Sequence, residues 1–123
     1  MSAFADVGSI PPQQIWQGVV GRTVHGRGLS FVVLELDADA VVPEHAHENE
    51  QLGVLLEGAM RFTIGDETRD LRPGDTWRIA AHVPHSVVVG GEGAVAVEAF
   101  APARDDWRAL EALDARRGRW PAA

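Results

Sequence analysis

The chain has 123 residues, a formal net charge of −7 at pH 7 and a hydrophobic content of 46%, which suits one folded domain and argues against intrinsic disorder. It contains no cysteine, so disulfides, thiolate metal sites and a cysteine nucleophile are excluded, and any metal must bind through nitrogen and oxygen. All basic residues are arginines and are scattered apart from a short tail at 116–119, so we expect no nucleic-acid partner, because phosphate-backbone binding requires clustered positive charge.

The chain divides by pattern into three segments. Residues 1-14 contain two adjacent prolines and no hydrophobic period, so they predict an extended N-terminal arm. Residues 15-103 carry short apolar runs separated by turn residues about every 8–12 positions, which is typical of an all-β barrel or sandwich. Residues 104-123 predict a C-terminal helix and tail, with an amphipathic helix over 104–113 packed on the outside of the barrel.

Alternating apolar residues, as in the segment 60–64, and glycine-rich turns set the expected strand limits. Gly58 is expected to separate two strands, and residues 90–93 (GGEG) to form the turn of a final hairpin. The predicted strands are 15–25, 29–36, 50–57, 59–65, 76–79, 85–90 and 93–100.

The strongest chemical signal is the pair His45 and His47. In an extended segment both would project from the same face, with Cα atoms about 6.6 Å apart, and two such imidazoles can converge on one ion at about 2.0–2.1 Å each. Two exposed histidines at a loop rim would give the same pattern. Three neighbouring glutamates are expected either to be solvated or to orient the imidazoles: Glu44, Glu48 and Glu50.

The histidine pair and several residues downstream of it resemble the two cupin motifs in identity and spacing. The first family motif is Gly, five residues, His-x-His, three or four residues, Glu, six residues, Gly; the second is Gly, five residues, Pro-x-Gly, two residues, His, three residues, Asn. The matching positions are His45, His47 and Gly58 in the first motif and Gly74 and His85 in the second. The departures are Asp39 for the opening Gly, Gln51 for Glu, Ala80 for Pro, His82 for the second Gly and Val89 for Asn. The resemblance extends over about residues 15–100 and implies a single RmlC-like jelly-roll cupin β-barrel.

This resemblance implies one divalent transition metal ion per chain, with His45, His47, Gln51 and His85 as ligands. Imidazole and amide ligands suit Ni, Zn, Mn, Fe or Cu, and the sequence does not select among them. The alternative for Gln51 is a hydrogen bond to an imidazole or to the backbone. His82 lies three residues before His85 and is expected to be a polar loop residue at the barrel mouth.

A narrower resemblance lies in residues 62–68 and 98–107, together with the glutamine in the ligand set. These segments are similar to the pectin-degradation cupins that open unsaturated uronate rings. The resemblance implies catalytic roles for Glu98 and Arg104, and substrate binding by Phe100 and Arg104. Glu98 and Phe100 share parity on one strand, so both can face the barrel interior. The alternatives are a solvent-exposed Glu98 and an Arg104 that pairs with Asp106 in the last helix.

These observations favour a metal-binding enzyme that opens or tautomerises unsaturated uronates or related sugar acids. A metal-dependent dioxygenase and a non-catalytic module that binds a metal or a small ligand are the alternatives. The resemblance also implies a homodimer. No apolar run approaches bilayer length and the first ten residues carry no basic leader, so we expect no membrane partner and a cytoplasmic location.

Overall fold

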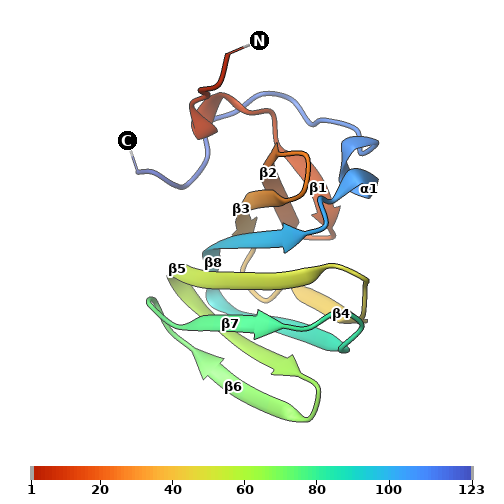
Figure 1. The fold of residues 1–123 in the computed structure, drawn as a ribbon. Coiled ribbons are helices and arrows are strands. Elements are labelled where there is room, and N and C mark those ends of the chain that lie inside the picture. Colours follow the sequence, from red (N-terminus) through yellow and green to blue (C-terminus); the bar gives the residue numbers. More distant parts are fainter. Residues whose placement is uncertain (1, 123) are drawn as a thin grey trace.

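The computed structural model describes residues 2–122 and folds them into an antiparallel jelly-roll β-barrel (Figure 1), which confirms the predicted all-β class. The sheet order is β1-β2-β3-β8-β5-β6, with β4 paired to β8 and β7 paired to β5. The strands are β1 (Gln13–Trp16), β2 (Val19–His25), β3 (Ser30–Leu36), β4 (Val41–His45), β5 (Glu50–Ile64), β6 (Glu67–Leu71), β7 (Thr76–Ile79) and β8 (His85–Ala101). A short 3₁₀ helix (Val7–Ser9) precedes them, and α1 (Asp105–Arg108) follows.

The two long strands β5 and β8 run beside each other through a shared bend, and this corrects two predictions. The chain does not break at Gly58, and residues 90–93 do not form a hairpin turn, because β5 and β8 are each continuous. At the bend Gly58 has a φ of 83°, and a Cβ there would lie 2.0 Å from the carbonyl oxygen of Gly93. Glycine therefore marks a barrel corner where two backbones meet, and the prediction of two turns is wrong.

Other strand limits also differ from the prediction. The expected strand 15–25 is two strands, because the turn around Gly18, with a φ of 76°, separates β1 from β2. The pattern missed β4, which contains Pro43, and β6, in which four of five residues are exposed. Pro43 interrupts the pattern in β4, and β6 is an edge strand without a buried face. Neither strand therefore shows the apolar alternation on which the prediction depends.

The hydrophobic core lies inside the barrel and includes Val32 and Leu55, which are fully buried. The predicted helix over 104–113 is wrong in length, because α1 contains only four residues. The chain then turns so that Leu113 N–H donates to the carbonyl oxygen of Pro12. Trp107 of α1 is buried against Phe100, with ring centroids 5.0 Å apart, so this segment closes over the barrel interior rather than resting on its outer surface.

Arg22 of β2, which is 1% exposed, connects both terminal segments to the sheet through hydrogen bonds. Its guanidinium forms an ion pair with Glu35 and donates to the carbonyl oxygens of Ile10 and Arg116. A buried guanidinium needs this many acceptors, because an unpaired buried charge is costly.

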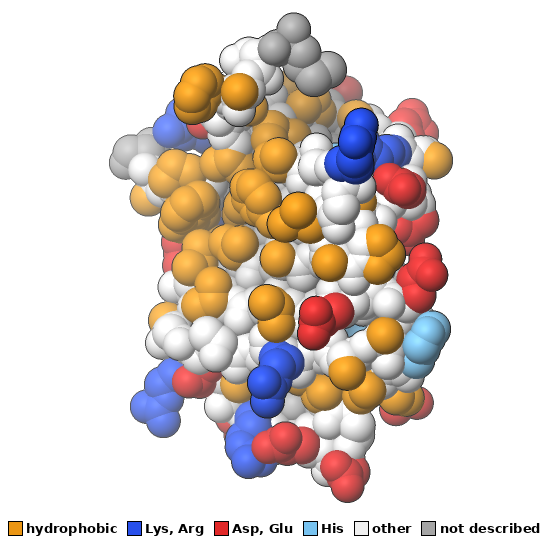
Figure 2. Space-filling model, in the orientation of Figure 1, with side chains coloured by type: hydrophobic (Ala, Val, Ile, Leu, Met, Phe, Trp, Pro, Cys, Tyr) orange, Lys and Arg blue, Asp and Glu red, His pale blue; other side chains and the backbone are white. Residues whose placement is uncertain are grey.

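Hydrophobic side chains gather on the face shown in Figure 2, over the region where Figure 1 places β2, β3, β8 and β5. The exposed large hydrophobic side chains of these four strands are Val24, Phe31, Leu52 and Val88. Within residues 2–122, no helix is long and apolar enough to cross a membrane.

Candidate functional site

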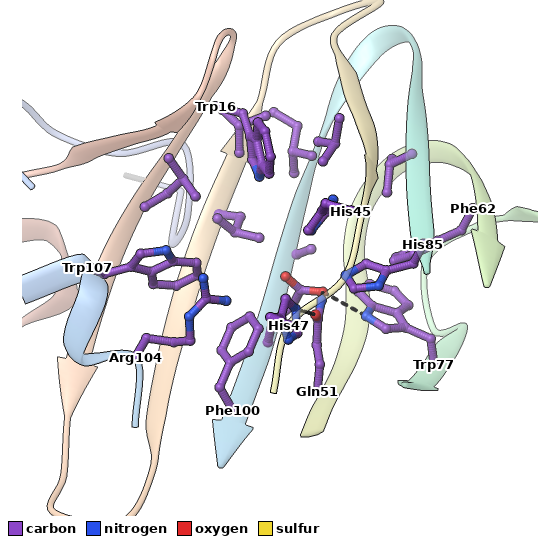
Figure 3. Close-up of a pocket in the computed structure, with 18 of the residues that line it drawn as sticks. Trp16, His45, His47, Gln51, Phe62, Trp77, His85, Phe100, Arg104 and Trp107 are labelled. Atoms are coloured by element: carbon purple, nitrogen blue, oxygen red, sulfur yellow. Dashed lines mark hydrogen bonds between the residues drawn. The ribbon is translucent and has the colours of Figure 1, made fainter. Parts of the chain in front are cut away.

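The barrel encloses a cavity of about 450 Å³ (Figure 3), a size within the usual range for sites that bind small molecules. Fifteen of its 22 lining residues are apolar. The seven polar lining residues come from β4, β5, β8 and the segments that adjoin them: His45, His47, Gln51, His85, Glu98, Arg104 and Asp106. None of these seven polar residues comes from β1, β2 or β3, whose contribution to the lining is apolar apart from the Trp16 indole N–H.

Three histidines meet in this cavity, as the sequence predicted for the two motifs together. His45 ends β4 and pairs in register with His85, which begins β8. His47 follows on the loop to β5. One ring nitrogen from each histidine lies within 4.8 Å of the other two. The fold therefore brings together a three-histidine group that is able to bind a metal ion.

Backbone carbonyls fix the tautomer of each histidine in this group. The Nδ1 atoms of His45, His47 and His85 lie 2.8, 3.0 and 2.9 Å from the carbonyl oxygens of residues 43, 49 and 83. Because a carbonyl oxygen can only accept, each Nδ1 carries the proton in these contacts. The Nε2 atom of each neutral ring then presents a lone pair, which is the form that binds a metal.

His85 Nε2 shows the fit to a metal most clearly. It is buried and has no hydrogen-bond partner among the described residues. Burial lowers the pKa of His85 to about 4 and also lowers the pKa of His47, which lies near the Arg104 guanidinium. Both rings are therefore neutral at pH 7. A buried lone pair without a donor costs free energy unless a cation or another donor satisfies it.

The Gln51 side chain lies beside the three-histidine group. Its Oε1 lies 3.0 Å from His47 Nε2, while its Nε2 donates to a carboxylate oxygen of Glu98. Since His47 Nε2 presents a lone pair, two acceptors face each other across this distance, which a shared cation would satisfy. Two ligand atoms bound at right angles to one ion at about 2.1 Å lie about 3.0 Å apart. The donor atoms of this group fit a divalent metal ion.

Glu98 lies inside the barrel and not on its surface, being 7% exposed. Its carboxylate accepts from Gln51 and from Trp77 Nε1, the latter over 2.8 Å (Figure 3). Burial raises the pKa of Glu98, and the two donors and the Arg104 charge oppose that rise. Trp77 can reach the carboxylate because Gly53 leaves room, since a Cβ at Gly53 would lie 2.2 Å from the indole.

Arg104 both lines the cavity and pairs with Asp106, so the two alternatives from the sequence are compatible. Its Nε and Nη2 donate to the two carboxylate oxygens of Asp106 over 3.1 and 3.0 Å. The guanidinium carbon lies 4.0 Å from the Trp107 ring centroid and 4.8 Å from that of Phe100. Asp106 thus occupies one edge of the guanidinium, and the end that carries Nη1 is left to meet an anion.

Other candidates from the sequence lie apart from this group. His82 is exposed and is not one of the three clustered histidines. Glu44, Glu48 and Glu50 are exposed, and backbone carbonyls take the orienting role considered for them. His82 and Asp39, which replace family glycines, have φ values of 67° and 63°, so the backbone keeps the left-handed conformation that glycine adopts most easily.

Sequence reasoning missed two residues that shape the cavity, Trp16 and Trp77, and it expected Asp106 only as a partner of Arg104 and not as a lining residue. Gly53 inside β5 was the available signal for Trp77, since glycine in a strand interior often marks a close approach. No sequence pattern could place Trp16, because its position depends on how the barrel closes.

Comparison with known proteins agrees with this architecture. The sequence pattern of the cupin domain family matches residues 32–100. This chain belongs to the cupin family. It is similar to the pectin degradation protein KdgF of Dickeya dadantii (strain 3937), with 29% identity over 80 residues, which are 64% of this chain and 73% of the relative.

Solved cupin structures resemble the barrel closely. KdgF from a Halomonas species superposes with a TM-score of 0.79 and 28% identity, covering 86% of this chain and 98% of that one. An RmlC-like cupin from Shewanella frigidimarina NCIMB 400 superposes with a TM-score of 0.80 and 24% identity, covering 87% and 96%. The second match supports the fold alone.

Proposed function

We propose that this cupin is a metal-dependent enzyme that opens the ring of a 4,5-unsaturated uronate or a related sugar acid. The Nε2 atoms of His45, His47 and His85 and the Oε1 atom of Gln51 would hold one divalent transition metal ion per chain. When bound, such an ion acts as a Lewis acid that polarises a substrate oxygen. The similarity to two KdgF proteins, one described as a pectin degradation protein, supports this substrate class.

The observation that carries the proposal is the buried carboxylate of Glu98 beside the three-histidine group. Its contact with Gln51 places it next to the proposed ligands, and it lines the same cavity. A carboxyl group is rarely kept inside a barrel without a purpose, because burial penalises its charged form. A raised pKa moves a carboxyl group toward the operating range of a general acid and base.

The proposed reaction is an isomerisation and needs no further reactant. The hemiacetal hydroxyl at C1 loses its proton, the bond from C1 to the ring oxygen breaks, and C1 becomes an aldehyde. The ring oxygen becomes the C5 ketone oxygen as C4 gains a proton. Glu98 would accept the first proton and return one to C4. The linear keto product has the same atoms as the cyclic substrate.

Arg104 and Phe100 would form the substrate-binding end. The Nη1 end of the Arg104 guanidinium would bind the substrate carboxylate, while Asp106 and the Trp107 ring hold the guanidinium in place. Phe100 is 3% exposed, and its ring lies 5.9 Å from that of His47. It would bound the space between the carboxylate and the metal.

The test is the ring-opening rate of metal-loaded protein, followed as loss of the ultraviolet absorbance of the substrate's enol ether. Glu98→Gln should lower kcat by about 10²- to 10⁴-fold, the usual contribution of a general acid–base, with its metal content unchanged. Glu92→Gln, on an exposed part of β8, is the matched control and should keep full activity. No acceleration over buffer by the wild type would refute the proposal, and metal-dependent oxygen uptake would point to a dioxygenase instead.

We also propose the homodimer that the sequence resemblance implies. Light scattering coupled to size-exclusion chromatography should give twice the 13.3 kDa chain mass. A mass of one chain at micromolar concentration would contradict it.

A further inference from the structure

The cavity wall formed by β1, β2 and β3 differs from the opposite wall. Its lining residues are Ile15, Trp16, Val19, Leu34 and Leu36. Among these side chains only Trp16 has a polar atom, the indole N–H. A sugar acid in the cavity would meet hydrocarbon on this side everywhere except at Trp16.

A β-bulge in β1 directs Trp16 into the cavity. Gln14 pairs with Val20 and Trp16 pairs with Val19, so the register shifts between them and Ile15 is the extra residue. Consecutive side chains of a regular strand point to opposite faces, yet Ile15 and Trp16 both line the cavity. Bulges commonly re-aim a side chain next to a functional site.

The indole of Trp16 has an unused hydrogen-bond donor. Its Nε1–H donates to no residue within 2–122, whereas the Trp77 Nε1–H is taken up by Glu98. Figure 3 shows the Trp16 indole projecting into the cavity from the side opposite Gln51 and Phe100. Its ring centroid lies 4.8 Å from that of His45, so a molecule held at the histidine group would also touch Trp16.

We propose that Trp16 is a specificity-determining residue that binds the sugar ring. The flat indole packs against the C–H face of the ring, and Nε1–H donates to one hydroxyl oxygen. Trp16 thereby contacts the part of the ligand that faces away from Arg104 and Glu98. The identity of the ligand as a uronate rests on the proposed function, while the contact itself rests on the bulge and the free indole donor.

The experiment is isothermal titration calorimetry of zinc-loaded protein with D-galacturonate, a saturated uronate that lacks the double bond of the proposed substrate. Trp16→Phe keeps an aromatic ring and removes the donor. We expect its Kd to rise about three- to tenfold, the effect of losing one neutral hydrogen bond. Trp120→Phe is the matched control, because Trp120 is 37% exposed and lies outside the cavity lining, and its Kd should equal that of the wild type.

Three results would overturn the inference. These are equal Kd values for W16F and W120F, a wild type that does not bind D-galacturonate, and a W16F variant that loses its zinc. The last would mean that Trp16 acts through His45. Failure of the proposed function is a separate result, seen when the wild type does not open an unsaturated uronate while galacturonate binding still depends on Trp16.

Discussion

The contribution of the hydrogen bond from Trp77 to Glu98 to the free energy of unfolding can be measured. Both residues are 7% exposed, and the donor and acceptor atoms lie 2.8 Å apart. Removing the donor of a buried acceptor costs about 1–3 kcal/mol, and replacing the indole by a smaller phenyl ring leaves a space that costs about 1 kcal/mol more. Trp77→Phe should therefore lower the free energy of unfolding by about 3 kcal/mol.

A double-mutant cycle with Glu98→Ala separates the two contributions. In the E98A background the acceptor is absent, so W77F should cost only the packing part, about 1 kcal/mol, and the coupling energy should be about 2 kcal/mol. Urea unfolding at pH 7, with equal metal loading of all four proteins, measures each value. A coupling energy below about 0.5 kcal/mol would refute the reasoning, since that is the range expected of independent sites.

Two further predictions concern backbone conformation and pH. Asp39→Gly and His82→Gly should each raise the free energy of unfolding by about 0.5–1 kcal/mol, because glycine adopts a positive φ without strain. Thermal melts measure the change, and Asp66→Gly, at a residue without positive φ, is the control. An equal gain in Asp66→Gly would contradict the explanation. Burial lowers the pKa of His25 below its usual value, so the unfolded chain binds this proton more tightly and stability should fall as the pH drops through about 6.5. His25→Gln should show a shallower fall in pH-dependent urea unfolding, and an unchanged slope would contradict the sign.

The sequence was sufficient for the fold class, which strand periodicity indicates, and for the three-histidine group, which the resemblance to the cupin motifs implies. His45 and His47 are close in the chain, and the cupin spacing from Gly74 pointed to His85 as their partner. The structure brings all three together. It also buries Glu98 and Phe100 together, in agreement with the shared parity that put them on one face of a strand, and it decides which face is inside, which parity alone left open.

The remaining differences have physical causes. Gly58 and Gly93 resemble turn residues in the sequence because glycine favours both turns and barrel corners, and only the pairing of β5 with β8 distinguishes the two. The bulge in β1 that directs Trp16 inward depends on its register with β2, which no single strand encodes. The last helix is short because the chain after it binds the N-terminal segment: Gln13 Nε2 donates to the carbonyl oxygens of Trp107 and Leu110, and these long-range contacts override helix propensity.

The metal content of the purified protein tests the central claim most directly. Elemental analysis should give about one divalent ion per wild-type chain and almost none in His47→Ala, because metal affinity depends on the full ligand set. His82→Ala, whose histidine is exposed and outside the group, should keep the ion. Equal metal content in His47→Ala and His82→Ala would contradict the assignment of the three-histidine group as the metal site.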